Sequence, residues 1–179
     1  MADRDRRVLT ELPVFPGTSP PAWPGLRIDG LVNAPVTLMV EDLRLLPTRE
    51  FVQDFQCEEG WVAAGQRWRG VRLSDLLELC ELDPSARHVS CSAGDFTVGL
   101  TIEEALAPET LLALRLQDRP LPPEHGGPCR LVVSGKPCFT SVKWVDRLTA
   151  LADRPQVTAE EIALKRIAEK SAGTDQGEG

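Results

Sequence analysis

Histidine, positive charge and long apolar runs are all scarce in this sequence, and each shortage excludes a class of protein. Only two of the 179 residues are histidines, which leaves little room for a zinc site with its three or four nitrogen, sulfur or oxygen ligands. No apolar run approaches the roughly 18 to 20 residues of a membrane-spanning helix, so no membrane insertion is expected. The two standard glycine-rich phosphate motifs are also absent, and nothing supports a nucleotide cofactor.

The balance of charge is acidic. Lys and Arg number 20 against 27 Asp and Glu, which gives a net charge of −7 near neutral pH. An acidic chain gains nothing from approaching a phosphate backbone, so nucleic acid is not expected as a partner. With 42% apolar and 26% charged residues, the composition is that of an ordinary globular protein. The length fits one domain with at most an appended arm.

The five cysteines indicate neither a disulfide framework nor a zinc ribbon. They stand at irregular spacings without a C-x-x-C pair, as Cys57, Cys80, Cys91, Cys129 and Cys138. An odd number without a pattern predicts mostly free thiols, each of which, taken alone, is expected to be buried as a small apolar side chain.

The first residues bear on the compartment. Arg6 and Arg7 look like the start of a twin-arginine export signal, but Glu11, Pro13 and Pro16 interrupt the apolar segment that should follow. A short polar arm is therefore expected in place of a targeting peptide, and the expected location is the cytoplasm.

Composition divides the chain into three parts. Residues 1–22 are rich in Pro and Arg without a sustained period, and an irregular arm is expected there. Residues 23–152 carry the regular patterns and are expected to form the domain. Residues 153–179 are expected to hold a peripheral helix, from the capping box at 158–161 to about Lys170, and then a disordered acidic tail.

The middle part alternates between short strands and short helices. A period of two predicts a hairpin over 26–40 and a strand over 51–57. Apolar residues at helical spacing predict a helix over 73–80 that buries Cys80, and a capping box at 101–104 opens another. Further strands are expected at 88–92, 96–100, 111–116, 131–133 and 142–145. Because strands and helices do not alternate strictly, the expected fold class is α+β with mixed sheets.

Cys57 is the first residue that could carry chemistry. It ends the alternating strand 51–57, ahead of a loop closed by Trp61, and functional sites gather at strand ends. Its thiolate could hold a redox metal as a soft ligand or act as a nucleophile, and the spacing does not choose between the two.

A loop rich in proline and glycine is the second candidate. His125 lies within PPEHGGP at 122–128, and Arg130 follows with a planar guanidinium suited to phosphate. Such a loop either lets the backbone approach a ligand closely or merely connects two strands. The other histidine, His88, begins a strand and is assigned no role.

Five motifs occur in a telling order. The hairpin RIDGLVNAPVTLMVEDLRLLP is followed by CEEGW at 57–61, WRGVRLSDLL at 68–77, HGGPCRLVV at 125–133 and SVKW at 141–144. Together they resemble the molybdenum-cofactor domain of the sulfite oxidase family, which includes the catalytic subunit of the protein-methionine-sulfoxide reductase. The resemblance covers residues 23–151.

This resemblance implies a sulfite-oxidase-type molybdopterin-binding fold that carries the molybdenum cofactor, Mo-molybdopterin. It implies that Cys57 is the protein ligand to the metal, and that the reaction is a two-electron oxygen-atom transfer on a small-molecule substrate, with a redox protein as a candidate partner. By the same resemblance, the cofactor contacts fall on His125, Arg130, Ser141, Val142 and Lys143.

The sequence also departs from the family pattern. Sulfite oxidases carry arginines just after the ligand cysteine, whereas Glu58 and Glu59 stand here. If these carboxylates face the metal they repel sulfite, which favours a neutral sulfoxide or N-oxide, unless Arg67 and Arg69 fold back towards them. The loop 135–140 lacks the usual Gly-Tyr-Lys pattern and brings Cys138, a second soft atom, near the site.

Two functions of different classes follow. The first is a molybdopterin-dependent oxidoreductase that uses Cys57. The second is a non-catalytic relative that keeps the fold and serves as a pterin-binding or protein-interaction module, which the short chain and the altered loop would allow. The sequence leaves the oligomeric state open.

Overall fold

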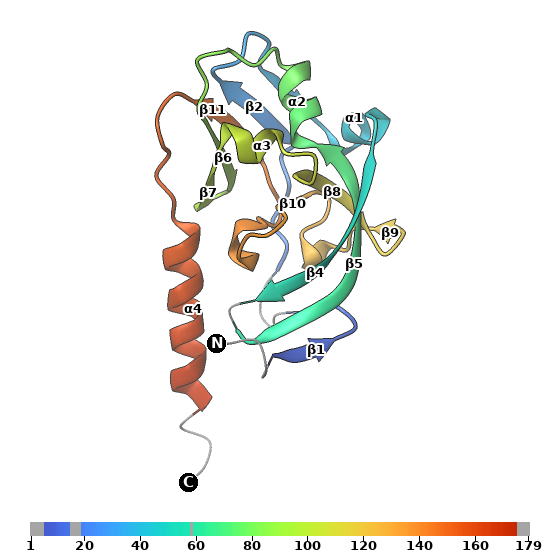
Figure 1. The fold of residues 1–179 in the computed structure, drawn as a ribbon, viewed down its shortest axis with the longest axis vertical. Coiled ribbons are helices and arrows are strands. Elements are labelled where there is room, and N and C mark those ends of the chain that lie inside the picture. Colours follow the sequence, from blue (N-terminus) through green and yellow to red (C-terminus); the bar gives the residue numbers. More distant parts are fainter. Residues whose placement is uncertain (1–5, 15–18, 58, 175–179) are drawn as a thin grey trace.

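Two β-sheets with short helices between them form the body of the protein (Figure 1). The computed structural model describes residues 6–14, 19–57 and 59–174. Both sheets are mixed, since each contains one parallel pair among antiparallel ones. The expected α+β class is therefore confirmed. Within the described ranges, no helix is both long and apolar enough to cross a membrane.

The first sheet is six-stranded and carries Cys57. Its path runs β1-β5-β8-β10, with β4 paired to β5 and β9 paired to β8. The strands are β1 (Arg7–Leu9), β4 (Arg49–Cys57), β5 (Trp61–Arg72), β8 (Leu111–Leu116), β9 (Arg119–Pro120) and β10 (Arg130–Val132). The antiparallel pair of β4 and β5 ends with Cys57 opposite Trp61. The predicted strand exit at Cys57 is confirmed.

The second sheet has five strands in the order β3-β2-β11-β6-β7. They are β2 (Leu26–Gly30), β3 (Val36–Leu38), β6 (His88–Ala93), β7 (Phe96–Thr101) and β11 (Arg147–Leu151). The predicted hairpin over 26–40 is present as β2 and β3. The strand predicted over 142–145 is wrong, because Trp144 has a φ of 57° that an extended strand cannot contain. The regular strand begins later, at Arg147.

Short helices connect the strands. They are α1 (Val40–Leu45), α2 (Leu73–Leu79), α3 (Ile102–Leu106), η1 (Pro123–His125) and η2 (Cys138–Thr140), and the longer α4 (Ala159–Thr174) follows the sheets. The capping box at α3 is confirmed, because Thr101 Oγ1 accepts the Glu104 N–H and the Glu104 carboxylate accepts the Thr101 N–H.

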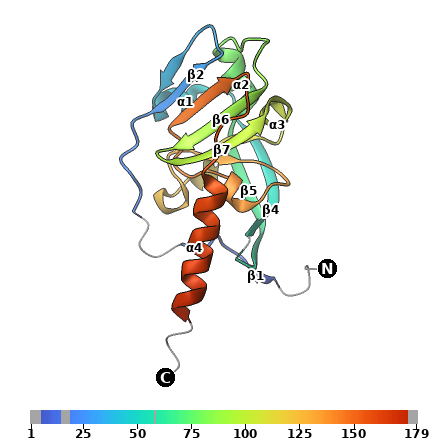
Figure 2. The same cartoon turned by 90° about the vertical axis from the view of Figure 1, so that its left-hand side faces the viewer.

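Helix α4 projects past the sheets in both views (Figures 1 and 2). Its start is fixed by Thr158, whose hydroxyl donates to Asp95 O and accepts from Thr97 N–H. Ile162 is half-buried and Leu164 is exposed, as expected for a peripheral helix. The helix runs to Thr174, beyond the predicted end near Lys170. Most of the acidic tail lies outside the described residues.

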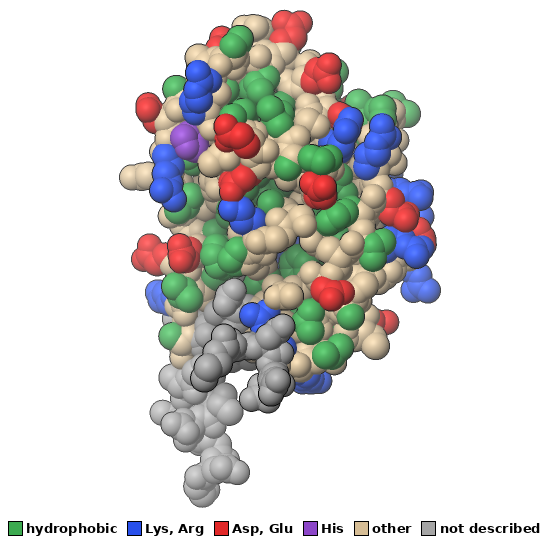
Figure 3. Space-filling view, in the orientation of Figure 1, with side chains coloured by type: hydrophobic (Ala, Val, Ile, Leu, Met, Phe, Trp, Pro, Cys, Tyr) green, Lys and Arg blue, Asp and Glu red, His purple; other side chains and the backbone are tan. Residues whose placement is uncertain are grey.

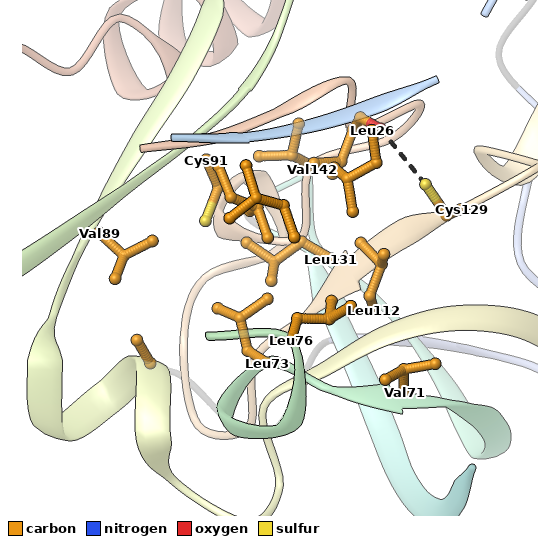
Figure 4. Packing of buried hydrophobic residues seen from close by; sticks show 14 of the residues in the cluster. Leu26, Val71, Leu73, Leu76, Val89, Cys91, Leu112, Cys129, Leu131 and Val142 are labelled. Carbon is orange, nitrogen blue, oxygen red and sulfur yellow. Dashed lines mark hydrogen bonds between the residues drawn. The ribbon is translucent and has the colours of Figure 1, made fainter. Parts of the chain in front are cut away.

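The main core lies where both sheets meet α2 and α3. Figure 4 shows Leu26 of β2, Leu76 of α2 and Leu131 of β10 converging there. The Cys129 thiol donates to Val145 O. The thiols of Cys80, Cys91 and Cys129 are fully buried in this core, as predicted. Burial of each such leucine stabilises the fold by roughly 1.5–3 kcal/mol, which holds the frame around the site.

The N-terminal arm is more regular than expected. Residues Arg7–Leu9 form β1, which pairs in parallel with the first three residues of β5. The pairing arises because β5 is long: β8 covers only its second half, which leaves the edge near Trp61 to accept another strand.

Candidate active site

Cys57 is buried at the end of β4, with 6% of its surface exposed. Its Sγ lies 2.9 Å from Sγ of Cys138, which η2 brings to the same place. The hydrogen bond with Cys138 and burial both raise the pKa of Cys57 well above its ordinary value. Without a bound metal ion the thiol is therefore protonated at neutral pH. A metal ion would supply the positive charge that stabilises the thiolate.

Arg130 is a buried cation beside these thiols. Its guanidinium lies 4.8 Å from the ring centre of Phe55 and 5.5 Å from that of Trp68. Burial lowers the pKa of Arg130 to about 10, so the group keeps its charge at neutral pH. None of the ion pairs between described residues includes Arg130. The site therefore has a positive charge that no carboxylate of the described residues balances.

The 122–128 loop is tightly built and packs against the site. A Cβ on Gly127 would lie 2.2 Å from Leu121 O, and Gly126 has a φ of 107° against the backbone of Lys143. The His125 carbonyl accepts from Nη1 of Arg130 at 3.1 Å. Burial and the nearby Lys143 and Arg130 lower the pKa of His125, so its imidazole is neutral at neutral pH. The loop holds a fixed shape, as a ligand-contacting loop requires.

The segment 141–144 completes one side of the site. The carbonyl of Ser141 accepts from Nε of Arg130 at 3.2 Å, and Lys143 forms an isolated β-bridge with Arg130. Nζ of Lys143 donates to Glu124 O at 2.7 Å. Val142 is buried, and its carbonyl accepts from Leu131 N–H. The structure thus brings together Arg130 and the four other residues expected to contact a cofactor.

A cleft opens between β4 and the loop before Ser141. Its volume is about 310 Å³, at the lower end of the range for ligand pockets. It is lined by Arg6, Gln53, Asp54, Phe55, Gln56, Val133, Gly135, Lys136, Pro137 and Ser141. Gln56 and Pro137 are the chain neighbours of Cys57 and Cys138, so the cleft borders the two segments that carry these cysteines.

A carboxylate also lies beside Cys57. Nε1 of Trp61 donates to Oε2 of Glu59 at 3.4 Å, and the negative charge of Glu59 is among the causes that raise the Cys57 pKa. The other acidic residue of the motif, Glu58, lies outside the described residues. Glu59 therefore adds negative charge at the place where sulfite oxidases are expected to carry arginines.

The two arginines that could have cancelled this charge are engaged elsewhere. Arg67 binds Asp118 at 2.9 Å and Arg69 binds Glu50 at 3.2 Å, at the opposite end of β4 and β5 from Cys57. They do not fold back towards Glu59. Figure 3 shows that acidic and basic side chains are mixed over one whole face, without a large patch of one sign.

Sequence reasoning missed the aromatic support of Arg130. The alternation of β4 places Phe55 on the same face as Cys57. The sequence pattern does not indicate that Arg130, from β10, lies over the ring of Phe55. Trp68 is fully buried in the core and also faces the guanidinium.

Known proteins share this architecture. The model of the oxidoreductase molybdopterin binding domain family matches residues 14–158, so the chain belongs to that family. It is 35% identical over 121 residues to the uncharacterised oxidoreductase YuiH of Bacillus subtilis, covering 67% of this chain and 61% of that protein. It is 33% identical over 157 residues to the protein-methionine-sulfoxide reductase catalytic subunit MsrP of Gluconobacter oxydans, covering 77% and 50%.

A solved structure agrees with the fold. The crystal structure of the sulfane dehydrogenase SoxCD from Paracoccus pantotrophus matches with a TM-score of 0.65 and 27% identity, over 73% of this chain and 38% of that one. The fold is thus of the sulfite oxidase type, and the chain carries a molybdopterin-binding domain of the oxidoreductase family, whose cofactor is Mo-molybdopterin. It spans about half to three fifths of the length of the curated relatives.

The residues fit such a cofactor. Within the described ranges no three His, Cys, Asp or Glu side chains are grouped to hold a metal by themselves. A metal here would need most of its ligands from a cofactor, and Cys57 offers one soft sulfur. The charge of Arg130, which no carboxylate of the described residues balances, suits an anionic cofactor.

Proposed function

We propose that this chain holds molybdenum through the thiolate of Cys57 and reduces a small neutral sulfoxide or N-oxide, rather than oxidising sulfite. The observation that carries the proposal is the pairing of a buried soft thiol with a buried guanidinium that has no carboxylate partner among the described residues. An anionic metal cofactor would balance the charge of Arg130 and deprotonate Cys57 at once.

Each residue of the site has a distinct part in this proposal. Arg130 is held in position by the carbonyls of His125 and Ser141, which leaves its charge to attract the anionic cofactor. The neutral imidazole of His125 can donate one hydrogen bond and accept another without adding charge. Lys143 adds a second cation next to the loop. When bound, the cofactor supplies two-electron oxygen-atom transfer.

The choice of a neutral substrate is supported by Glu59. Its carboxylate lies beside Cys57 and is held by Trp61, and a fixed negative charge opposes the approach of an anion such as sulfite. A sulfoxide carries no net charge and avoids this repulsion. The name of MsrP, a protein-methionine-sulfoxide reductase, supports the same choice.

The reaction needs a source of electrons. Reduction of a sulfoxide to a sulfide consumes two electrons and two protons and releases one water molecule. We propose that a redox protein supplies these electrons, and that the reaction takes place in the cytoplasm.

The first experiment combines metal analysis with turnover. Protein from a host that makes the molybdenum cofactor should contain about one molybdenum and one pterin per chain, and should reduce methionine sulfoxide with a dye electron donor. Cys57→Ser should lose the metal and at least 99% of the turnover, because the soft ligand is replaced by a hydroxyl. Cys80→Ser is the matched control, since Cys80 is buried in the main core.

Three results would contradict the proposal. A folded Cys57→Ser variant that keeps full metal content and turnover would exclude Cys57 as the ligand. Bound pterin without reduction of any sulfoxide or N-oxide would favour the non-catalytic binding module. Faster turnover of sulfite than of sulfoxides would reverse the proposed direction.

A further inference from the structure

Two cysteines from distant parts of the chain meet at the end of β4. Sγ of Cys138 lies 2.9 Å from Sγ of Cys57, although 81 positions separate them in the sequence. A disulfide bond requires a separation of about 2.05 Å, so the sulfur atoms need to approach by only roughly 0.9 Å. The contact between β4 and η2 already holds the two backbones together. Covalent closure thus needs little movement of the fold.

The two thiols differ in their access to solvent. Cys138 is half-buried, whereas only 6% of Cys57 is exposed. The cleft of about 310 Å³ is lined by Pro137, next to Cys138, and by Gln56, next to Cys57. A small reagent therefore reaches the more exposed Cys138 first, and Cys57 lies in contact with it.

We propose that Cys57 and Cys138 form a reversible disulfide in the cofactor-free protein, and that this bond locks the metal ligand until it is reduced. The oxidant is a low-molecular-weight disulfide. The Cys138 thiolate attacks one of its sulfur atoms, which forms a mixed disulfide and releases one thiol. Cys57 then attacks the Cys138 sulfur, which releases the second thiol. Two electrons pass from the cysteines to the oxidant, and their two protons end on the two released thiols.

The bond has two consequences for the site. It removes the sulfur of Cys57 that a metal would bind, and it ties η2 to β4 beside the cleft. Cofactor insertion would then require a reduced pair. Formation of the bond does not depend on the proposed function, and only the effect on insertion rests on it.

The test uses the full chain from a host that does not make the molybdenum cofactor. The folded protein is incubated with oxidised glutathione, its remaining thiols are alkylated, and its peptides are mapped by mass spectrometry. The five alkylatable thiols should fall to three, since 5 − 2 = 3, with one Cys57–Cys138 linked peptide that dithiothreitol removes. Cys91→Ser is the matched control and should still lose two thiols, whereas Cys138→Ser should form no internal link.

The wild-type peptide map decides the proposal even if Cys138→Ser does not fold. The disulfide is excluded if all five thiols persist in the native protein while the same oxidant links cysteines in guanidinium, or if a link forms to Cys80, Cys91 or Cys129. For the lock, linked protein should take up at least tenfold less molybdopterin than the same protein after reduction. Equal uptake by both forms would overturn the lock.

Discussion

A buried cation without a carboxylate partner is costly, and Arg130 has none among the residues that the structure describes. Loss of hydration for a buried ion costs several kcal/mol, which hydrogen bonds and aromatic rings only partly offset. The carbonyls of His125 and Ser141 and the ring of Phe55 provide this partial compensation. A protein keeps such a group where a ligand supplies the opposite charge, which ties this residue to cofactor binding rather than to stability.

Glu59 gives a prediction at the same scale. Replacement Glu59→Gln keeps a polar side chain beside Trp61 but removes the negative charge near Cys57. A unit charge at this range contributes about 1 to 2 kcal/mol near a protein surface. The ratio of kcat/KM for sulfite to that for a sulfoxide should therefore rise about tenfold, as measured by steady-state kinetics of the loaded protein.

Glu50→Gln is the matched control for that comparison, because Glu50 lies at the other end of β4 and pairs with Arg69. It should leave the ratio unchanged. An equal ratio for Glu59→Gln and the wild type would remove Glu59 as the basis of substrate choice.

At the scale of elements, the 122–128 loop is held by close backbone packing. Gly127→Ala places a methyl group where Leu121 O lies 2.2 Å away, so the loop must shift. The free energy of unfolding should fall by about 1 to 3 kcal/mol, and pterin content should fall at least tenfold, because the loop carries the His125 carbonyl that holds Arg130.

Gly94→Ala separates these two effects. Gly94 has a positive φ but open space around its Cβ position, so the substitution strains the turn between β6 and β7 and leaves the 122–128 loop untouched. It should lower the midpoint of thermal unfolding and leave pterin content intact. Full pterin content in Gly127→Ala would show that the loop conformation is not needed for binding.

Elements with clear periodicity could be predicted from the sequence, and those shaped by tertiary contacts could not. The helix over 73–79 and the strands β7 and β8 have regular apolar spacing that matches their burial. Strand β5 was missed because Ala64, Gly65 and the buried polar Gln66 interrupt its apolar alternation. The segment 142–145 has apolar residues of strand length, but its backbone turns at Trp144 to reach the 122–128 loop.

The candidate site was reached differently. Motif order suggested Cys57, His125, Arg130 and the 141–143 segment, and the structure brings them into one region. Pattern alone could not give the Arg130 contact with Phe55 or the 2.9 Å approach of Cys138 to Cys57. Both depend on how β10 and η2 pack against β4, which local sequence does not encode. The metal ligand and the cytoplasmic location stay predictions.

At the scale of the whole molecule, stability should depend on pH through His125. Burial and the cations of Lys143 and Arg130 lower the pKa of His125 below its ordinary 6.5 in the folded state, against a weaker effect of Glu124. Below about pH 6.5 the unfolded chain binds a proton that the folded protein resists, so stability is present at higher pH and is lost as the pH falls. The cofactor-free protein should therefore unfold at a lower temperature at pH 5.5 than at pH 7.5.

Calorimetry of the wild type and of His125→Gln tests this dependence. The difference between the two pH values should shrink in the variant, since glutamine does not titrate. The chosen window lies above the ordinary carboxyl pKa range, where Asp29 and Glu104 stay ionised in both states. An unchanged difference in His125→Gln would assign the pH dependence to another group.

The strand order of the second sheet has a consequence for biosynthesis. Strand β11 is the last strand in the chain and lies between β2 and β6 at the centre of the sheet. Until residues 147–151 have emerged from the ribosome, no strand joins β2 to β6, and the edges of these two strands that pair with β11 lack their hydrogen-bond partner. The domain therefore completes its fold only late in translation. A cofactor can be inserted only after β11 has emerged from the ribosomal exit tunnel.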